Sequence, residues 1–334
     1  MTAHELVQKL TEKLSSAGVE NAAGEARYIA EDALDAGMTW FFLNGNKELV
    51  CEEKAADGSM VKTAQGLAVD RAWEFAERRC QGEPIQYILG HTNFMGLDIK
   101  VAPGVLIPRP ETEFLCGLAS AALEELAEAR SSEAGKSAES ESPADDSLHI
   151  LDLCTGSGCI AACMQDDFPD AKVYAADISE EALAIAKQNV PESVTLLQGD
   201  LFGALDGLDG AEQNGSNSNG SGKSQDSAGK NIKFDLIISN PPYIPSRVVD
   251  GLSTEVKDHE PRLALDGGEE GMDLIEKIIV EAADWLTTGG LLYMETDETQ
   301  RSLLLETCEK CGRYSEFEVI KDLAGKDRYL RAKL

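Results

Sequence analysis

The sequence LDLCTGSGCIA at residues 151–161 decides the fold class of this chain. It is typical of an apolar strand that passes through a glycine turn into a helix. Gly156 and Gly158 allow the backbone to turn tightly and to approach a ligand closely. Asp177 ends the next predicted strand, where an acid can accept both hydrogens of a ribose diol. The turn and the acid together predict a site for an adenosine-containing cofactor.

Further strands and helices alternate along the chain after this turn. Short apolar runs predict strands at residues 149–153, 172–177, 194–199, 234–239 and 289–296. Helical segments lie between several of them. This alternation favours an α/β domain with a mainly parallel sheet that is covered on both faces.

The first part of the chain has a different pattern, with apolar residues at helical spacing. Stripes that contain Leu6, Leu10 and Leu14, then Ala26, Ile29 and Ala30, and a third run at residues 60–79 predict a small helical bundle. We expect three parts: a helical domain at 1–85, a β-hairpin linker at 86–110 with Gly96 near its turn, and the α/β domain at 111–334.

Two segments have the composition of solvated chain. Residues 127–148 are rich in Ser, Ala and Glu and predict a linker or a frayed helix end. Residues 203–231 are rich in Gly, Ser and Asn and carry few large apolar side chains. We expect the second segment to be a disordered surface insertion between two strands.

The overall composition narrows the class of protein. Sixty acidic residues against thirty basic ones give a net charge of -30, which disfavours direct binding to nucleic acid because phosphates would be repelled. We expect no membrane span and no signal peptide, and therefore a cytoplasmic protein. Cys308 and Cys311 form one CxxC pair, which we interpret as two ordinary helix cysteines, so that no metal site is expected.

A second motif, FDLIISNPPYIP at residues 234–245, separates the possible activities. It places Asn240, Pro241, Pro242 and Tyr243 directly after a strand, at the sheet edge where such folds bind ligands. A nicotinamide oxidoreductase would explain the glycine turn, which also fits G-x-G-x-x-A, but would leave this motif without a role.

The motif suits methyl transfer to a planar nitrogen. The lone pair of an amide or aromatic amine is conjugated, so the nitrogen is a poor nucleophile. The side-chain oxygen of Asn240 and the carbonyl of Pro241 can both accept hydrogen bonds from one NH2 group, and Tyr243 can stack on the planar acceptor. The rigidity of Pro241 and Pro242 would hold these groups in place.

The whole chain resembles the release-factor glutamine methyltransferase family. The resemblance is carried by residues 82–113, which contain IPRPETE, by the two motifs above, by HEPRLALDGGEEGMD at 259–273 and by KDLAGKDRYL at 321–330. It implies a Rossmann-like domain dependent on S-adenosylmethionine, joined by the β-hairpin to an N-terminal substrate-recognition bundle. It implies that the protein methylates the glutamine of the Gly-Gly-Gln loop in class I peptide chain release factors. We expect the protein to be a monomer.

The resemblance also implies roles for individual residues. The cofactor would be held by Cys154, Thr155, Gly156, Ser157, Gly158, Asp177, Leu201 and Asn240, with Leu201 against the adenine. The glutamine side chain would be bound by Asn240, Pro241, Pro242 and Tyr243, of which Asn240, Pro241 and Tyr243 would act in catalysis.

Three positions depart from the family pattern. Cys154 stands where the family often has glycine, and we expect the thiol to fit if φ stays negative there. Leu201 replaces a residue that can be aromatic, and Asp297 can alter a turn. Methylation of adenine in nucleic acid remains the alternative activity, because adenine-specific nucleic-acid methyltransferases share the Asn-Pro-Pro-Tyr motif.

For each of four charged residues, the sequence leaves two possible roles open. Arg109 and Glu111 either line the site or anchor the hairpin, and Glu260 and Asp266 belong either to a lid or to a surface turn.

Overall fold

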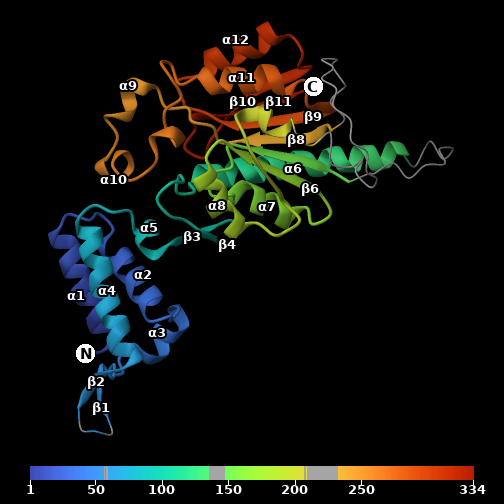
Figure 1. The fold of residues 1–334 in the computed structure, drawn as a ribbon. Coiled ribbons are helices and arrows are strands. Elements are labelled where there is room, and N and C mark those ends of the chain that lie inside the picture. Colours follow the sequence, from blue (N-terminus) through green and yellow to red (C-terminus); the bar gives the residue numbers. More distant parts are fainter. Residues whose placement is uncertain (56, 58, 135–146, 207, 209–231) are drawn as a thin grey trace, which may run out of the picture. The chain divides into compact units, whose positions relative to one another are not determined.

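The computed structural model describes residues 1–55, 57, 59–134, 147–206, 208 and 232–334. These residues form two compact units (Figure 1). The first contains residues 1–91 together with 253–259, and the second contains 92–252 and 260–334. The contribution of 253–259 to the first unit was not expected from the sequence. Among the helices in the described ranges, none combines the length and the apolar character needed to cross a bilayer.

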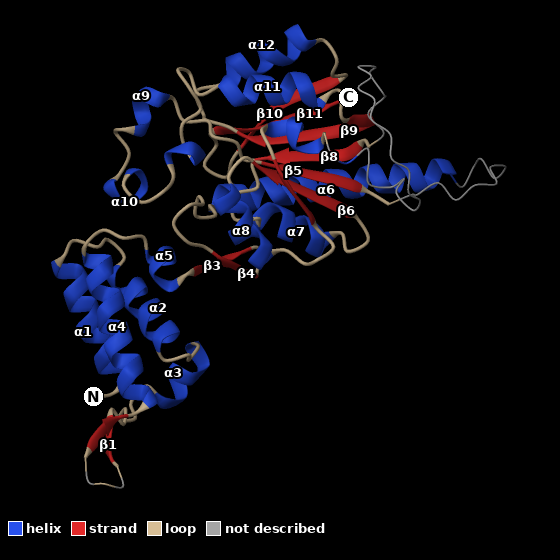
Figure 2. Ribbon diagram, viewed as in Figure 1, coloured by secondary structure: helices blue, strands red, loops and turns tan. Residues whose placement is uncertain are grey.

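Helices build the first unit, as the sequence predicts (Figure 2). They are α1 (Ala3–Ser16), α2 (Ala22–Ala33), α3 (Met38–Asn44), α4 (Ala64–Cys80) and α5 (Ile85–Leu89). Leu6, Leu10 and Leu14 of α1 are fully buried. Burial of each such side chain stabilises the fold by about 1.5–3 kcal/mol. Gly18, whose φ is +83°, follows the end of α1.

The third predicted helix begins later than expected. Residues 60–62 instead form the strand β2 (Met60–Lys62), which pairs antiparallel with β1 (Glu52–Lys54). The prediction was wrong there because three residues are too few to distinguish a helical repeat from a strand. The helix α4 follows Thr63, whose side-chain oxygen accepts a hydrogen bond from the Gly66 amide at 3.1 Å.

The segment 253–259 is held in the first unit by an ion-pair cluster. Arg79 on α4 is buried, and its Nε donates to Glu25 Oε2 at 2.5 Å. Its Nη2 donates to Glu255 Oε2 at 3.2 Å. Glu255 belongs to α10 (Thr254–Lys257). Because the buried guanidinium of Arg79 binds both carboxylates, removal of either acid would leave the positive charge of Arg79 less well compensated.

A seven-stranded sheet forms the centre of the second unit, in the order β10-β11-β9-β8-β5-β6-β7. The strands are β5 (His149–Leu153), β6 (Lys172–Asp177), β7 (Thr195–Gln198), β8 (Phe234–Ser239), β9 (Leu286–Glu295), β10 (Glu316–Lys321) and β11 (Asp327–Lys333). Neighbours from β7 to β9 are parallel, and β11 is antiparallel to both of its neighbours. The predicted mainly parallel sheet is confirmed.

Helices cover both faces of this sheet, which explains the continuous apolar runs in its strands. Figure 1 shows α7 (Cys159–Asp167) and α8 (Glu180–Asn189) on one face, and α11 (Asp273–Ala282) and α12 (Arg301–Cys311) on the other. The long helix α6 (Pro110–Ala134) packs beside α7. Shorter elements are η1 (Leu201–Leu205), α9 (Ser246–Val249) and η3 (Arg262–Ala264).

The β-hairpin predicted before this domain is present as β3 (His91–Phe94) and β4 (Leu97–Lys100). Met95 and Gly96 connect the strands with φ values of +52° and +87°. Two successive positive φ values match the twist of a tight hairpin, which confirms the predicted turn at Gly96.

Both predicted solvated segments begin with ordered structure. Residues 127–134 continue α6, and Arg130 Nη1 forms an ion pair with Asp235 Oδ1 at 2.6 Å. Residues 135–146 lie outside the described residues. In the second segment, Ala204 and Leu205 are buried against the core. The expectation of a disordered insertion from residue 203 was therefore wrong at its start, and residues 207 and 209–231 lie outside the described residues.

The topology places the loops that follow β5 and β8 next to each other at one edge of the sheet. From β5 the chain adds β6 and β7 on one side, and then β8 returns to the other side of β5. The strand order therefore reverses between β5 and β8. At such a reversal, the loops after the two strands diverge and leave a crevice at their carboxyl ends.

Candidate active site

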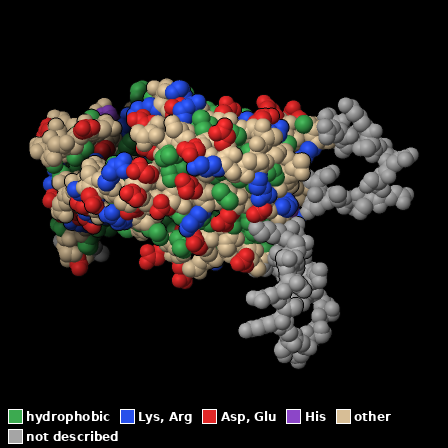
Figure 3. Space-filling view, turned by 90° about the horizontal axis from the view of Figure 1, so that it is seen from above, with side chains coloured by type: hydrophobic (Ala, Val, Ile, Leu, Met, Phe, Trp, Pro, Cys, Tyr) green, Lys and Arg blue, Asp and Glu red, His purple; other side chains and the backbone are tan. Residues whose placement is uncertain are grey.

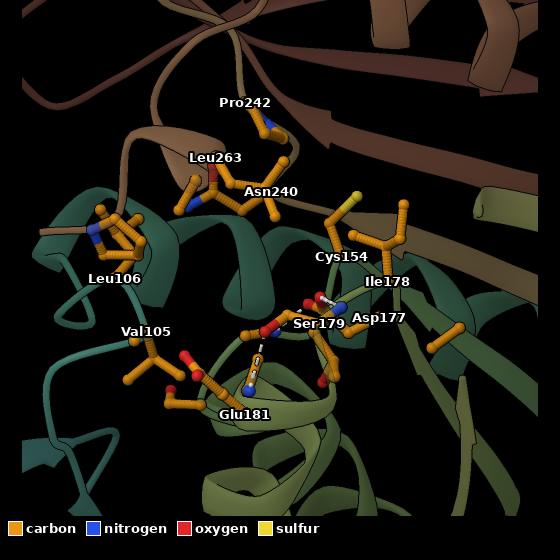
Figure 4. A pocket seen from close by; sticks show the side chains of 18 of the residues that line it. Val105, Leu106, Cys154, Asp177, Ile178, Ser179, Glu181, Asn240, Pro242 and Leu263 are labelled. Atoms are coloured by element: carbon orange, nitrogen blue, oxygen red, sulfur yellow. Dashed lines mark hydrogen bonds between the residues drawn. The ribbon is translucent and has the colours of Figure 1, made fainter. Parts of the chain in front are cut away.

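A cavity of about 430 Å³ occupies this crevice and is lined entirely by the second unit. This volume is in the range of small-molecule and cofactor sites. Figure 4 shows Asn240, Pro242 and Leu263 on one side of it, and Asp177, Ser179 and Glu181 on the other. The predicted residues that line it are Cys154, Thr155, Gly156, Ser157, Asp177, Leu201, Asn240 and Pro242.

The glycine turn is fixed by its own backbone. Gly156 and Gly158 have φ values of +54° and +81°, in the left-handed region that favours glycine. A Cβ at Gly158 would lie 3.0 Å from the Cβ of Ala186 on α8. Gly158 itself lies outside the lining of the cavity, so its part in the site is to permit the close approach of the turn to α8.

Asp177 stands at the end of β6 and faces the turn. Its Oδ2 accepts a hydrogen bond from the Gly156 amide at 2.9 Å, and its Oδ1 accepts one from the Ser179 amide at 2.9 Å. Each carboxylate oxygen can accept more than one hydrogen bond. The two amides therefore orient the group while it keeps capacity to accept from a diol in the cavity.

A second acid, Asp152, lies behind the turn and was not predicted as part of the site. It is fully buried, and its Oδ2 accepts from Thr155 Oγ1 at 2.5 Å and from the Ala161 amide at 3.1 Å. Burial raises the pKa of this carboxyl to about 7, and the charge of Asp177 adds to the effect. Asp152 thus holds the strand, the turn and α7 together.

Two positions in the lining have a strained backbone. Cys154 has a φ of +59° and Leu201 has a φ of +48°. The condition that Cys154 keeps a negative φ was therefore wrong. The close turn after β5 requires the left-handed conformation, which costs a non-glycine residue about 1–2 kcal/mol. Burial also raises the pKa of the Cys154 thiol, so the group stays neutral.

Asn240 reaches the cavity from the end of β8. Its Nδ2 donates to Thr112 Oγ1 at 3.0 Å. Thr112 is buried and also lines the cavity. With Nδ2 used in this way, Oδ1 is the polar atom of the side chain that can serve an incoming N–H donor. The predicted acceptor role for Asn240 thus has a matching geometry.

The other members of the motif lie in two places. Pro242 lines the cavity with Asn240, whereas Pro241 and Tyr243 are outside the lining formed by the described residues. The Tyr243 hydroxyl donates to Glu295 Oε1 at 2.9 Å, and burial together with the Glu295 charge raises its pKa. Its ring packs against the main core cluster of the second unit. This position gives no support to the expected stacking on the acceptor.

The Gln300 side chain and two closely packed glycines hold the backbone of the Asn-Pro-Pro-Tyr motif in place. Gln300 is buried, and its Nε2 donates to the carbonyls of Tyr243 at 2.9 Å and Gly271 at 3.0 Å. A Cβ at Gly271 would lie 2.1 Å from the Tyr243 carbonyl, and one at Gly267 would lie 2.6 Å from the Pro242 carbonyl. Both positions therefore require glycine, which explains the DGGEEG sequence.

The four charged residues with open interpretations are now placed. Arg109 Nη2 donates to Glu260 Oε1 at 2.5 Å, and Glu260 is buried, which excludes a simple surface turn for that acid. Asp266 accepts from Ser246 Oγ at 2.5 Å and from the Gly268 amide at 3.1 Å, and these bonds lower its pKa. Glu111 contributes its carbonyl to a hydrogen bond from Tyr329. Asp266 and Glu111 thus have structural contacts.

Several residues of the lining were not singled out from the sequence. They are Val105, Leu106, Pro108, Thr112, Ile178, Ser179, Glu181 and Leu263. Ile178 and Ser179 could have been found, because they directly follow the acid at the end of β6. The others come from the loop before α6 and from α6, α8 and η3, whose approach to the cavity is decided by the tertiary fold.

The lining fits an adenosine-containing sulfonium compound. The oriented carboxylate of Asp177 suits a ribose diol, and Ile178 and Leu201 give apolar contact for a flat base. The glycine turn allows close backbone approach at the end of β5. Among the described residues, no cluster of three or more His, Cys, Asp or Glu side chains has the arrangement of a metal site.

Comparison with known proteins gives consistent results. Residues 5–90 match the PrmC N-terminal domain, and residues 150–212 match a methyltransferase domain. The release factor glutamine methyltransferase of Moorella thermoacetica is 38% identical over 266 residues, which cover 78% of each chain. That of Deinococcus radiodurans is 32% identical and covers 100% of this chain and 99% of the other. A methyltransferase structure from Pyrococcus furiosus is 21% identical, with a TM-score of 0.41, and covers 72% of this chain and 89% of that one.

The similarity thus extends over both units and over the sequence that forms the cavity. Identity above 30% across whole chains exceeds what a shared fold alone requires. The fit of the cavity agrees with an enzyme that uses S-adenosylmethionine. We conclude that this chain is a methyltransferase that belongs to the release factor glutamine methyltransferase family.

Proposed function

We propose that the protein methylates the side-chain amide nitrogen of the glutamine in the Gly-Gly-Gln loop of class I release factors. The observation that carries this proposal is the orientation of Asn240, whose Nδ2 is bound to Thr112 and whose Oδ1 is left as an acceptor. A glutamine amide offers two N–H donors on the nitrogen that must react. The release factor glutamine methyltransferases that are 32–38% identical to this chain support the same substrate.

The residues of the site would act by placing and polarising this nitrogen. A hydrogen bond from the amide to Asn240 Oδ1 draws electron density toward nitrogen and fixes its direction. When bound, S-adenosylmethionine supplies an electrophilic methyl group on sulfur. The N–C bond would form as the bond from sulfur to the methyl carbon breaks, with its electron pair left on sulfur, so that S-adenosylhomocysteine leaves. One N–H bond of the amide would break, and its proton would go to solvent. The carbonyl of Pro241 as a second acceptor remains a prediction.

The surface charge supports a protein substrate. The net charge is -30, and acidic and basic side chains are interspersed over the face drawn in Figure 3. On that face, no broad area of the described residues is covered by Lys and Arg alone. Binding to a phosphate backbone usually requires such an area. We therefore infer that the protein acts without direct binding to nucleic acid. The proposed release-factor substrate leads us to infer a role in translation termination, in the cytoplasm.

The test is mass spectrometry of a purified release factor after incubation with the protein and S-adenosylmethionine, with nucleic acid present as a competitor. We expect a gain of about 14 daltons, one methylene, on the Gly-Gly-Gln peptide. A factor with Glu in place of that Gln is the matched control and should gain nothing. Methyl groups found only on adenine would overturn the proposal. Light scattering of the purified protein tests the expectation of a monomer.

A further inference from the structure

Glu295, at the end of β9, is a buried acid that does not line the cavity but contacts two residues of the site. It is 1% exposed. Its Oε2 accepts from Thr112 Oγ1 at 2.7 Å, and its Oε1 accepts from the Tyr243 hydroxyl at 2.9 Å. One carboxylate oxygen therefore holds Thr112, which contacts Asn240, and the other holds Tyr243 of the Asn-Pro-Pro-Tyr motif.

The direction of these hydrogen bonds has a consequence for Asn240. A threonine hydroxyl has one hydrogen to donate and can accept through its lone pairs. Burial raises the pKa of Glu295, whereas the hydrogen bonds from Thr112 and Tyr243 and the charge of Arg328 favour its ionised form. An ionised carboxylate can only accept, so the Thr112 hydrogen points to it, and Thr112 Oγ1 is left to accept. The partner of Thr112 must then be a donor, which is Asn240 Nδ2 at 3.0 Å.

We propose that Glu295 is a positioning residue that sets the side-chain amide of Asn240, through the Thr112 hydroxyl, so that Oδ1 faces the substrate nitrogen. The proposal rests on the proposed function, because an acceptor is needed there for an amide N–H. Asn can present either its oxygen or its nitrogen to the cavity, and the two orientations have nearly the same shape. Because Glu295 accepts the Thr112 hydrogen, Asn240 must donate through Nδ2 to Thr112, and only one of its two orientations fits.

Glu295→Gln would restore the ambiguity without changing the size of the side chain. A glutamine carries both a donor and an acceptor. Its NH2 can donate to Thr112 Oγ1, which reverses the hydroxyl and allows Asn240 to turn its amide over. Thr112→Val removes the relay itself, and Thr112→Ser keeps it.

The orientation can be measured without any substrate. In the protein bound to S-adenosylmethionine, the side-chain NH2 signals of Asn240 are assigned by NMR from their absence in Asn240→Asp. We expect one Asn240 amide proton to exchange slowly in the parent and to exchange at least about tenfold faster in Glu295→Gln and Thr112→Val. Unchanged protection in both variants would overturn the proposal.

Kinetics give the second measurement, with a release factor as substrate. We expect kcat to fall about 10–100-fold in Glu295→Gln and Thr112→Val, while the Kd for S-adenosylmethionine stays within about threefold. Thr112→Ser should recover about tenfold over Thr112→Val. In the double variant, Glu295→Gln should add little, because both changes act through the same hydroxyl.

The matched control is Asp235→Asn, the same acid-to-amide change in another buried acid. Asp235 is 3% exposed and accepts from the His149 amide at 2.9 Å and from Thr287 Oγ1 at 3.0 Å. It lies at the start of β8, whereas Asn240 follows the end of that strand. Asp235→Asn should keep the slow Asn240 exchange. An equal loss of protection and of kcat in both acid variants would show only a general structural role for Glu295.

A change of selectivity gives the last measurement. A release factor with Gly-Gly-Glu presents carboxylate oxygens, which Asn240 Oδ1 repels and Nδ2 would attract. This Gly-Gly-Glu factor should therefore inhibit the Glu295→Gln variant about 3–10-fold more strongly than it inhibits the parent enzyme. If the parent methylates no release factor, the proposed function fails, while the exchange measurement still tests the positioning role of Glu295.

Discussion

The two loops that meet in the cavity are held in different ways. The glycine turn after β5 is fixed mainly by backbone amides, with the Gly156 amide on Asp177 at 2.9 Å and the Thr155 amide on the Ala176 carbonyl at 3.0 Å. The loop after β8 is fixed by side chains, with Asn240 on Thr112 and Thr112 on Glu295.

This difference determines how each loop responds to substitution. The amides of the turn can donate whichever side chains the turn residues carry, so the turn tolerates Cys154 where a glycine would be less strained. A side-chain relay depends on the donor or acceptor character of each member. The turn should therefore keep its shape when its side chains change, but respond to changes in the charge of the acids that bind it. Substitutions in the Asn-Pro-Pro-Tyr loop should mainly lower the rate of methyl transfer.

The largest expected effect is on stability and comes from Asp152, behind the turn. Its pKa rises from an ordinary value of 3.8 to about 7 because of burial. The folded protein then binds one proton more than the unfolded chain between about pH 4 and pH 7, so the free energy of unfolding falls as the pH rises through this window. The whole shift corresponds to about 4 kcal/mol.

Asp152→Asn tests this expectation, because the amide oxygen can still accept from Thr155 and Ala161. Urea unfolding at several pH values should show a smaller decline from pH 4 to pH 7 in the variant than in the parent. Parallel curves for the two proteins would show that Asp152 does not titrate in this window.

The next effect separates the two loops by rate. Asn240→Ala removes the acceptor and should lower kcat by about 10²–10³, as expected for loss of a preorganised contact. The Kd for S-adenosylmethionine should change only a few-fold, because Asn240 is one of many residues around the cavity. Single-turnover methylation and calorimetry measure the two quantities. A large loss of cofactor affinity with an unchanged rate would place Asn240 on the cofactor side.

Asp177→Ala is the converse test and should act on binding. Each hydrogen bond from a diol to the carboxylate is worth about 1.5–3 kcal/mol, so the Kd for S-adenosylmethionine should rise by about 10–150-fold per bond lost. At saturating cofactor, kcat should recover to within a few-fold of the parent. A rate that stays low at saturation would mean that Asp177 also shapes the acceptor side.

The smallest effect concerns the strained backbone of the turn. Cys154→Gly and Cys154→Ala both remove the thiol, but only glycine tolerates a φ of +59° without strain. We expect the glycine variant to be more stable than the alanine variant by about 1 kcal/mol. Thermal unfolding compares them directly. Equal stability would show that the turn relaxes to a negative φ when the sulfur is removed.

The sequence by itself determined the local parts of the protein. The strand-turn-helix at residues 151–161, the hairpin turn at Gly96 and the helical stripe of Leu6, Leu10 and Leu14 follow from neighbouring residues. The acid at Asp177 could be found because it ends the strand next to the turn. These features depend on φ preferences and apolar periodicity, which act over short distances.

Only the tertiary structure decided the contacts between distant segments. Asn240 is 128 residues from Thr112, and Thr112 is 183 residues from Glu295. The position of the Tyr243 hydroxyl on Glu295 also follows from the pairing of β8 with β9. A single sequence carries no signal for which buried acceptor a hydroxyl will meet, because hydrogen-bond partners are set by the packing of whole elements. The positive φ of Cys154 has the same origin, since the sheet and α7 together impose a turn that the residue alone disfavours.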